Sequence, residues 1–175
     1  MKWPWILAIA WLSTGESSIL ISIVGSNPSQ KEELALALQS RHPSDIEIIY
    51  EMEYLKDPMK KGSYVSKDYD LDQFIYSDAY NLKRGLGVVL PNGRKVEPKP
   101  VILCVGYHFI DGYSMRSCFR LSIFVDEKKE RDAYFTSYIL PTKKNAKIAL
   151  ENEGQKSLLM PTIYSMIDRY IQEGR

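Results

Sequence analysis

The strongest constraint on the fold of this chain is a run of strand-forming residues between positions 101 and 140. Apolar, β-branched and aromatic side chains fill 101–125 and 131–140, and a charged loop, 126–130, separates the two stretches. A turn signal, Asp111-Gly112, interrupts the first stretch. Turn residues between apolar runs are typical of hairpins. The sequence therefore predicts a three-stranded antiparallel meander in this part of the chain.

The side-chain pattern selects one register for this hairpin. The odd-numbered positions of 119–125 are all apolar, and a three-residue loop at 110–112 puts them on the same face as the apolar odd positions of 103–109. The same register sets Cys104 directly opposite Cys118, within disulfide distance. We therefore predict a disulfide between Cys104 and Cys118. The alternative is that both cysteines stay reduced as small buried residues.

The first 15 residues have the layout of a secretory signal peptide. One lysine precedes an apolar run at 3–12, and small residues stand just before Glu16. The run is shorter than the roughly 20 residues that span a bilayer. We expect a signal peptide at 1–15 and one domain at 16–175, with no integral membrane span after signal removal. Together with the disulfide, this predicts a periplasmic or secreted protein; the alternative is a cytosolic domain whose apolar start is core.

The other segments carry local signals for helices and strands. These predict a strand at 18–25, a helix from Asn27 as N-cap with Pro28 in its first turn, a strand with one solvated face at 45–55, a helix at 71–85, a hairpin around Asn92-Gly93, and a closing helix at 157–175. Residues 141–154 fit either helix or strand. The predicted fold class is α+β: a single domain with a mixed or antiparallel sheet and a C-terminal meander, packed by two to three helices.

Composition excludes several kinds of function. A formal net charge of +1 gives no sign of a nucleic-acid partner, and two histidines with two cysteines give no metal site, so no cofactor is expected. The aspartates of 68–72 lack the glycine and glutamate of a calcium loop and suit the start of a helix. The stretch 24–31, VGSNPSQK, links a strand to a helix but lacks the Gly-Lys-Ser/Thr of a P-loop, so a plain helix cap is predicted.

We predict no catalytic residues, and one alternative set remains. In the chosen register His108 lies opposite Ser114, with Asp111 in the turn between them, which are the residue types of a hydrolase triad. A solvent-facing hairpin tip lacks the enclosed cleft and the oxyanion hole that such chemistry needs.

The order of elements resembles that of small bacterial periplasmic domains: the amino-terminal domain of the Tol-Pal translocation protein, the lipoprotein activators of penicillin-binding proteins, and the curli secretion lipoprotein. The matching segments are 19–25, 30–41, 45–55, 101–140 and 162–172. A lipobox cysteine and a Thr-Gly-Glu turn at 126–131 are missing, and 56–98 is additional. The resemblance implies a non-enzymatic exported module of the cell envelope that binds or assembles with a protein partner. The alternative function is a small secreted hydrolase, and the sequence leans away from an enzyme.

Overall fold

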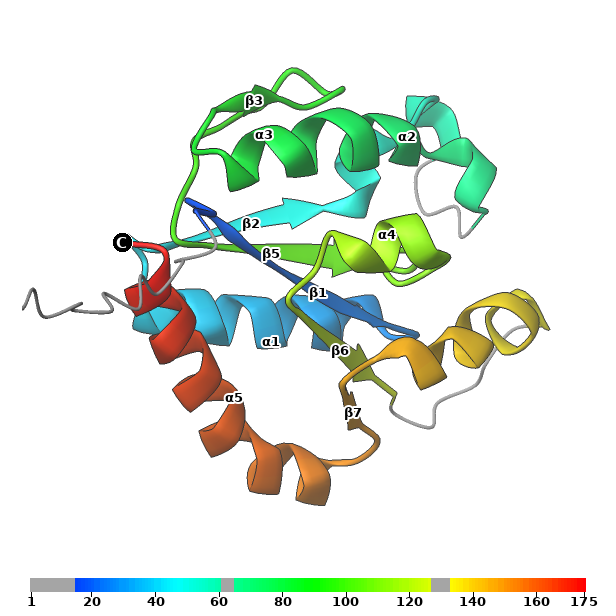
Figure 1. Ribbon diagram of the computed structural model, residues 1–175. Coiled ribbons are helices and arrows are strands. Elements are labelled where there is room, and N and C mark those ends of the chain that lie inside the picture. Colours follow the sequence, from blue (N-terminus) through cyan, green and yellow to red (C-terminus); the bar gives the residue numbers. More distant parts are fainter. Residues whose placement is uncertain (1–14, 61–64, 127–132) are drawn as a thin grey trace, which may run out of the picture.

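The computed structural model describes residues 15–60, 65–126 and 133–175, and a parallel five-stranded sheet forms its centre (Figure 1). The strand order is β2-β5-β1-β6-β7, and each neighbouring pair is parallel. The strands are β1 (Ile19–Gly25), β2 (Ile46–Tyr50), β5 (Val101–Gly106), β6 (Leu121–Val125) and β7 (Ile148–Leu150). The predicted signal peptide lies outside the described residues except for its last position.

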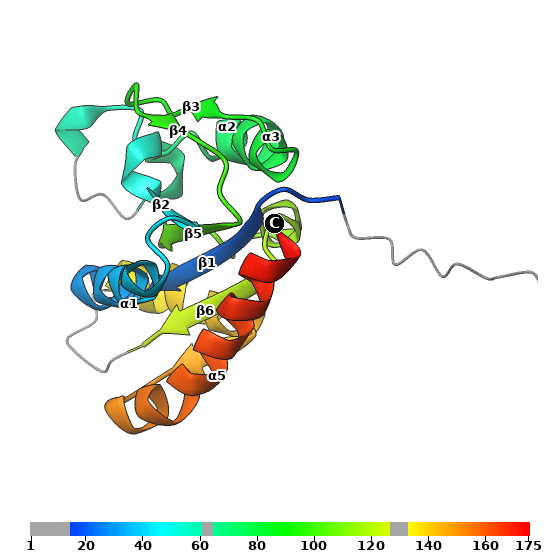
Figure 2. The same ribbon diagram turned by 90° about the vertical axis from the view of Figure 1, so that its left-hand side faces the viewer.

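Helices cover both faces of this sheet, so the architecture has three layers (Figures 1 and 2). One face carries α1 (Pro28–Arg41) and α5 (Glu153–Glu173). The other face carries α2 (Leu71–Gln73), α3 (Ala79–Lys83), α4 (Tyr113–Ser117) and the antiparallel hairpin of β3 (Val88–Val89) and β4 (Lys95–Val96). Short helical segments are η1 (Glu51–Tyr54), η2 (Pro58–Lys60), η3 (Ser66–Asp68), η4 (Phe74–Asp78), η5 (Phe135–Ile139) and η6 (Leu140–Asn145). Among the described residues, no helix has both the length and the apolar character needed to cross a bilayer.

Strand β1 is buried on both faces, which its continuous apolar sequence predicts. Ile21 and Ile23 pack on the side of α1 and α5, whereas Leu20 and Val24 pack on the side of α3 and α4. Because successive side chains of a strand point to opposite faces, β1 contributes residues to two separate apolar clusters.

The predicted fold class is wrong, because the sheet is parallel and the described residues of 101–140 form no antiparallel meander. β5 and β6 do not pair with each other; both pair in parallel with β1, which lies between them. The turn signal at Asp111-Gly112 precedes a helix, α4, instead of a returning strand, and Gly112 is its N-cap with a φ of 74°. The expected third strand at 131–140 contains the helical segment η5. A strand buried on both faces and a strand of a buried hairpin have similar apolar sequences, so the pattern did not separate them.

Most of the locally encoded elements are confirmed. The Asn27 side chain caps α1 and Pro28 is its first residue. The hairpin around Asn92-Gly93 is present as β3 and β4, and the closing helix is α5, which begins earlier, at Glu153. The segment 141–154, which the sequence left as helix or strand, contains both: all but the first residue of η6, then β7 and the first two residues of α5.

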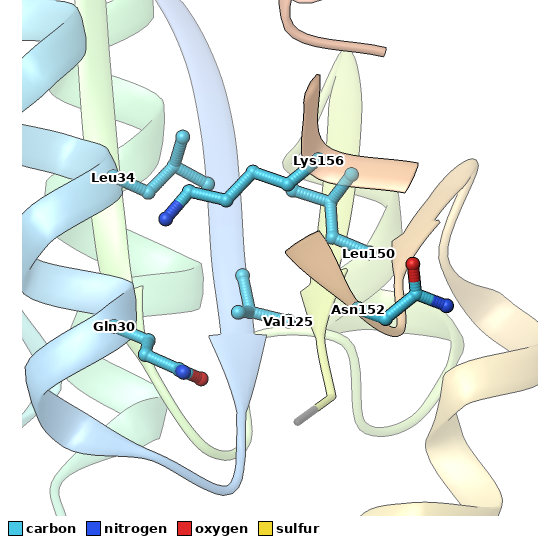
Figure 3. Close-up of a pocket in the computed structure, with 6 residues that line it drawn as sticks. All are labelled: Gln30, Leu34, Val125, Leu150, Asn152 and Lys156. Carbon is cyan, nitrogen blue, oxygen red and sulfur yellow. The ribbon is translucent and has the colours of Figure 1, made fainter. Parts of the chain in front are cut away.

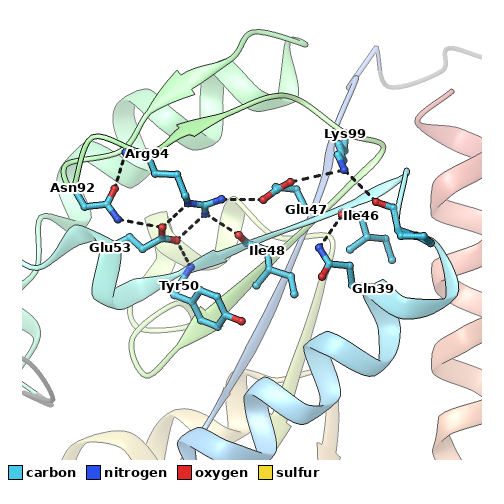
Figure 4. Close-up of polar contacts among 10 residues, drawn as sticks. Gln39, Ile46, Glu47, Ile48, Tyr50, Glu53, Asn92, Arg94 and Lys99 are labelled. Atoms are coloured by element: carbon cyan, nitrogen blue, oxygen red, sulfur yellow. Dashed lines mark hydrogen bonds and ion pairs between the residues drawn. The ribbon is translucent and has the colours of Figure 1, made fainter.

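The β3–β4 hairpin is tied to the edge strand β2 by one arginine (Figure 4). The Arg94 guanidinium donates to Glu53 Oε1 at 2.6 Å and to Glu47 Oε1 at 2.9 Å, and its Nη2 donates to the carbonyl oxygen of Ile48 at 2.8 Å. Since Glu53 belongs to η1, this network fixes the corner at which the chain leaves the sheet after β2.

Candidate functional site

The candidate site lies at the carboxyl ends of β1, β2 and β5. After β1 the chain enters α1 on one face of the sheet, and after β5 it enters α4 on the opposite face (Figure 1). Ligands of open parallel sheets bind at such a point, where neighbouring strands send their connections to opposite sides.

A cavity of about 280 Å³ opens here, and we call it the Lys31 cavity. It is lined by Pro28, Lys31, Glu32, Tyr50, Glu51, Met52, Tyr69, Val105, Gly106 and Tyr107. Its walls therefore come from the first turn of α1, the β2–η1 corner, the end of β5 with the residue that follows it, and Tyr69 between η3 and α2. The volume is close to the lower end of the range for small-molecule sites.

Lys31 is the unusual residue of this cavity, because its side chain is only 2% exposed. Its Nζ donates to the carbonyl oxygen of Gly106 at 2.8 Å and lies 3.4 Å from the centre of the Tyr107 ring. Burial lowers the pKa of Lys31 to about 7, and the nearby charge of Glu51 offsets part of this effect. Even with Glu51 nearby, a lysine with this pKa loses its proton near neutral pH unless a further anion binds beside it.

Glu51 is also 2% exposed, and backbone amides hold its carboxylate. Oε2 accepts from the amide of Tyr107 at 2.6 Å, and Oε1 accepts from the amide of His108 at 3.0 Å and lies 2.9 Å from its Nδ1. This approach requires a glycine at position 106, because a Cβ there would lie 2.6 Å from Cβ of Glu51. The sequence pattern placed Glu51 on a solvated strand face; that placement is wrong, since the chain turns into η1 at this residue.

The segment from Gly25 to Lys31 has the spacing of the first glycine and the lysine of a P-loop, G-x-x-x-x-G-K-[ST]. Gln30 and Glu32 stand where that pattern has glycine and Ser/Thr. Helix α1 already begins at residue 28, and Asn27 Oδ1 accepts from the amides of residues 29 and 30 at 3.0 and 3.4 Å. The predicted helix cap is therefore present, and it occupies backbone amides of the kind that hold phosphate in a P-loop.

A second cavity, of about 340 Å³, adjoins the first through Tyr69, and we call it the His108 cavity. It is lined by Lys56, Ser66, Lys67, Tyr69, Asp70, Leu71, Asp72, Ile75, His108, Asp111 and Met115. His108 is 2% exposed, and its Nε2 has no hydrogen-bond partner among the described residues.

A third hollow lies between α1, β6, β7 and α5 (Figure 3). Figure 3 shows its lining residues, Gln30, Leu34, Val125, Leu150, Asn152 and Lys156. Its volume is about 10 Å³, which is room for about one water molecule. Oε1 of Gln30 is buried without a partner among the described residues, so a water here would satisfy it.

The predicted disulfide loses its geometric basis in this structure. Cys104 lies in β5 and Cys118 at the end of α4, both inside one apolar cluster, and both thiols are free. Burial raises the pKa of each thiol. The hairpin that set them opposite each other does not exist, because the intervening residues form α4.

The alternative triad is not assembled. The imidazole of His108 meets Glu51, whereas the side chains of Asp111 and Ser114 are exposed. Asp111 lines the His108 cavity, but within the described residues no hydrogen bond joins the three side chains. The residues that sequence reasoning missed are Lys31 and Glu51. The spacing of Gly25 and Lys31 was a signal for the first, whereas the burial of Glu51 depends on distant packing.

The described part of the chain contains no group of three His, Cys, Asp or Glu side chains that could hold a metal ion. Of the aspartates at 68–72, Asp70 caps the start of α2 by accepting from the amide of Gln73, as predicted. Asp68 pairs with Lys60 at 2.6 Å.

The fold is similar to that of solved kinase structures. A structure described as a possible uridine kinase from Bacillus stearothermophilus matches with a TM-score of 0.56 and 13% identity, over 77% of this chain and 89% of that one. Another, described as a candidate fructose transport system kinase from Silicibacter sp. TM1040, matches with a TM-score of 0.51 and 14% identity, over 89% of this chain and 78% of that one. No protein-family model and no curated protein sequence matches the chain.

These matches correct the predictions that followed from the periplasmic resemblance. The chain has a parallel α/β fold like that of these two kinase structures, not that of the Tol-Pal domain or the envelope lipoproteins, so the resemblance was wrong. The prediction of a non-enzymatic envelope module is therefore also wrong. The predicted periplasmic or secreted location is wrong for the same reason, because the similar structures are kinases. The leaning away from an enzyme has likewise lost its support, because the fold is one that kinases have.

Proposed function

We propose that the protein is a kinase-like enzyme that binds a nucleoside triphosphate at the Lys31 cavity and transfers its terminal phosphoryl group to a hydroxyl. The observation that carries this proposal is the position of Lys31. It stands at the P-loop spacing from Gly25, on the first turns of α1, in the wall of a cavity at the carboxyl edge of a parallel sheet.

The chemistry of Lys31 suits a phosphate ligand. Among the described residues its ammonium group contacts one carbonyl oxygen and one aromatic ring, and the charge of Glu51 lies nearby. A phosphate group beside Nζ favours the charged form, because an adjacent opposite charge raises the pKa of a buried lysine. Binding therefore recovers part of the free energy that burial of this amine costs. The N-terminus of α1 adds a favourable field for an anion.

Glu32 lines the same cavity at the position where a P-loop has a hydroxyl residue. Its carboxylate is an oxygen ligand of the kind that Mg²⁺ prefers, so a magnesium ion carried by the nucleotide would have one protein ligand here. In the transfer step, the acceptor oxygen forms a bond to the terminal phosphorus while the bond to the bridging oxygen breaks. The leaving electron pair stays on the nucleoside diphosphate.

A second candidate function is nucleotide binding without phosphoryl transfer. The Asn27 cap favours it, since the two amides that it occupies are the groups a P-loop uses to cradle phosphate. Gln30 and Glu32 in place of glycine and Ser/Thr favour it as well.

Calorimetric titration of the purified chain with Mg-ATP and Mg-GTP tests the proposal. We expect binding that Lys31→Met weakens at least tenfold, because the charged phosphate contact is lost while side-chain length is kept. The matched control is Lys95→Met, which changes an exposed lysine of β4 outside both cavities and should leave the affinity unchanged. Absence of nucleotide binding to the unmodified chain would overturn both candidate functions.

Release of nucleoside diphosphate in the presence of uridine, sugars and polyols then separates the two candidates. Phosphorylated product supports the enzyme, and tight binding without product across this panel supports the second candidate. The double variant Gln30→Gly, Glu32→Thr restores the P-loop pattern and should tighten nucleotide binding. The gain should be smaller than the loss in Lys31→Met, and weaker nucleotide binding by a folded double variant would contradict a phosphate contact at this segment.

A further inference from the structure

The Glu51–His108 pair resembles the oriented imidazoles that accept protons in enzymes. The Nδ1 of His108 lies 2.9 Å from Oε1 of Glu51, and the same oxygen accepts from the backbone amide of His108. A carboxylate only accepts hydrogen bonds, so the neutral ring carries its proton on Nδ1. Nε2 is then left with an unshared electron pair.

This second nitrogen is buried and has no hydrogen-bond partner among the described residues. Buried acceptors of this kind are rare, and such an atom is open to a partner from outside the chain, such as a ligand, a water molecule or a reacting group. The ring belongs to the wall of the His108 cavity. Two aromatic rings neighbour the imidazole, Tyr69 at a centroid distance of 6.0 Å and Tyr107 at 6.4 Å, so packing restricts the orientation of the ring.

The two cavities adjoin in a way that suits a two-substrate reaction. Tyr69 lines both of them. Glu51 lines the Lys31 cavity and holds the histidine of the other one. A phosphate group beside Lys31 and a hydroxyl group beside His108 would therefore approach each other where the two cavities adjoin, at Tyr69.

We propose that His108 is the proton acceptor of the transfer reaction, oriented by Glu51, and that the His108 cavity binds an acceptor molecule with several hydroxyl groups. This proposal rests on the proposed function. In the step, the acceptor oxygen bonds to phosphorus, its proton passes to Nε2 of His108, and the nucleoside diphosphate leaves with the electron pair of the broken P–O bond. Glu51 stabilises the imidazolium that forms.

The lining of the cavity indicates the acceptor class. The polar groups are Ser66, Asp70, Asp72, Asp111, Lys56 and Lys67. Carboxylates and a hydroxyl accept hydrogen bonds from hydroxyl groups, whereas the two ammonium groups donate to them. A polyhydroxylated molecule, such as a sugar or the ribose of a nucleoside, satisfies both kinds of group. These charged groups surround His108 together with Glu51, which contacts its Nδ1, and Lys31, which lies on the far side of Glu51 in the first cavity.

Two experiments test the proposal, and one of them needs no catalysis. The chain has only two histidines, so the Cε1–Hε1 region of its imidazole NMR spectrum has two signals, which His108→Gln and His42→Gln assign. Uridine and fructose are added in separate titrations. We expect the signal of His108 to shift with one of them, which also identifies the acceptor as a nucleoside or a sugar, while the signal of His42 stays in place. If neither compound moves the His108 signal, the acceptor site is refuted.

The kinetic experiment compares His108→Gln with His42→Gln as its matched control. His42 pairs with Asp168 at 2.7 Å and lines neither cavity. We expect the His108 variant to lose about 100-fold or more in kcat and to lose the rise of rate with pH, with nucleotide affinity unchanged. Full transfer activity in this variant would overturn the role of His108 while leaving the proposed function intact. Failure of the unmodified chain to bind nucleotide would overturn the proposed function instead.

Discussion

The buried ammonium group of Lys31 makes folding stability rise with pH across the mildly alkaline range. An unfolded lysine has a pKa of 10.5, and burial lowers this value to about 7 in the folded chain. Below pH 7 both states hold the proton, so the folded state bears the whole penalty, which is about 5 kcal/mol for a shift of this size. Between pH 7 and 10.5 the unfolded state binds more protons. The free energy of unfolding therefore increases, by at most about 1.4 kcal/mol per pH unit.

Urea denaturation of the wild-type chain and of Lys31→Met at several pH values measures this effect. The variant keeps a long, unbranched side chain but has no proton to lose. Titration of the cysteines and tyrosines contributes equally to both proteins and cancels in the difference. From pH 7.5 to 9.5 the wild type should gain about 2.5 kcal/mol relative to the variant. A difference that stays constant over this range would refute the reasoning, because it would mean that Lys31 titrates alike in both states.

Three further predictions concern a glycine, an arginine and the two cysteines. Gly25→Ala should lower the free energy of unfolding by about 2–4 kcal/mol in urea titrations, because the residue has a φ of 146° and a Cβ would lie 1.9 Å from the carbonyl oxygen of Val125. Arg94→Lys should cost about 1–2 kcal/mol in the same assay, since an ammonium group cannot reproduce the forked contacts of the guanidinium; equal stability would contradict this. Thiol labelling of native protein at pH 8 should be slow at Cys104 and Cys118 and complete after unfolding, because burial raises both pKa values; an intact mass lacking two hydrogens would reveal a disulfide instead.

The elements of this fold that the sequence predicts are those with local causes. An asparagine before a proline starts α1, an Asn-Gly pair turns the β3–β4 hairpin, and an apolar stripe marks α5. Strand pairing has no such local cause. The segments 101–106 and 121–125 are apolar enough for either a buried hairpin or a parallel sheet, and their pairing with β1 depends on residues about 80 to 100 positions away. The Asp-Gly pair between them favours a turn, but a turn can lead into a helix as well as into a strand.

The residues of the candidate site differ in the same way, since one has a local sequence signal and the other does not. Lys31 stands at a recognisable spacing from Gly25, so its position in a strand–helix connection was open to sequence reasoning. Glu51 was not, because the alternation of β2 predicts an exposed side chain at this position. Only the absence of a side chain at Gly106, more than 50 residues away, makes room for its carboxylate beside the two backbone amides that follow β5.

At the start of α1, the residues that favour a capped helix compete with phosphate for the same backbone amides. Pro28 fixes a helical φ, Asn27 caps the first amides, and Gln30 favours helix over glycine by roughly 1 kcal/mol. These three residues therefore favour a conformation in which the backbone amides of this segment belong to the capped helix. An N-cap contributes about 1 kcal/mol, which corresponds to roughly a fivefold factor in an equilibrium constant. A phosphate that displaces the Asn27 carboxamide thus loses little affinity, whereas its pairing with the buried amine of Lys31 offsets a penalty several times larger. Nucleotide affinity should for this reason depend on Lys31 far more than on the residues that depart from the P-loop pattern.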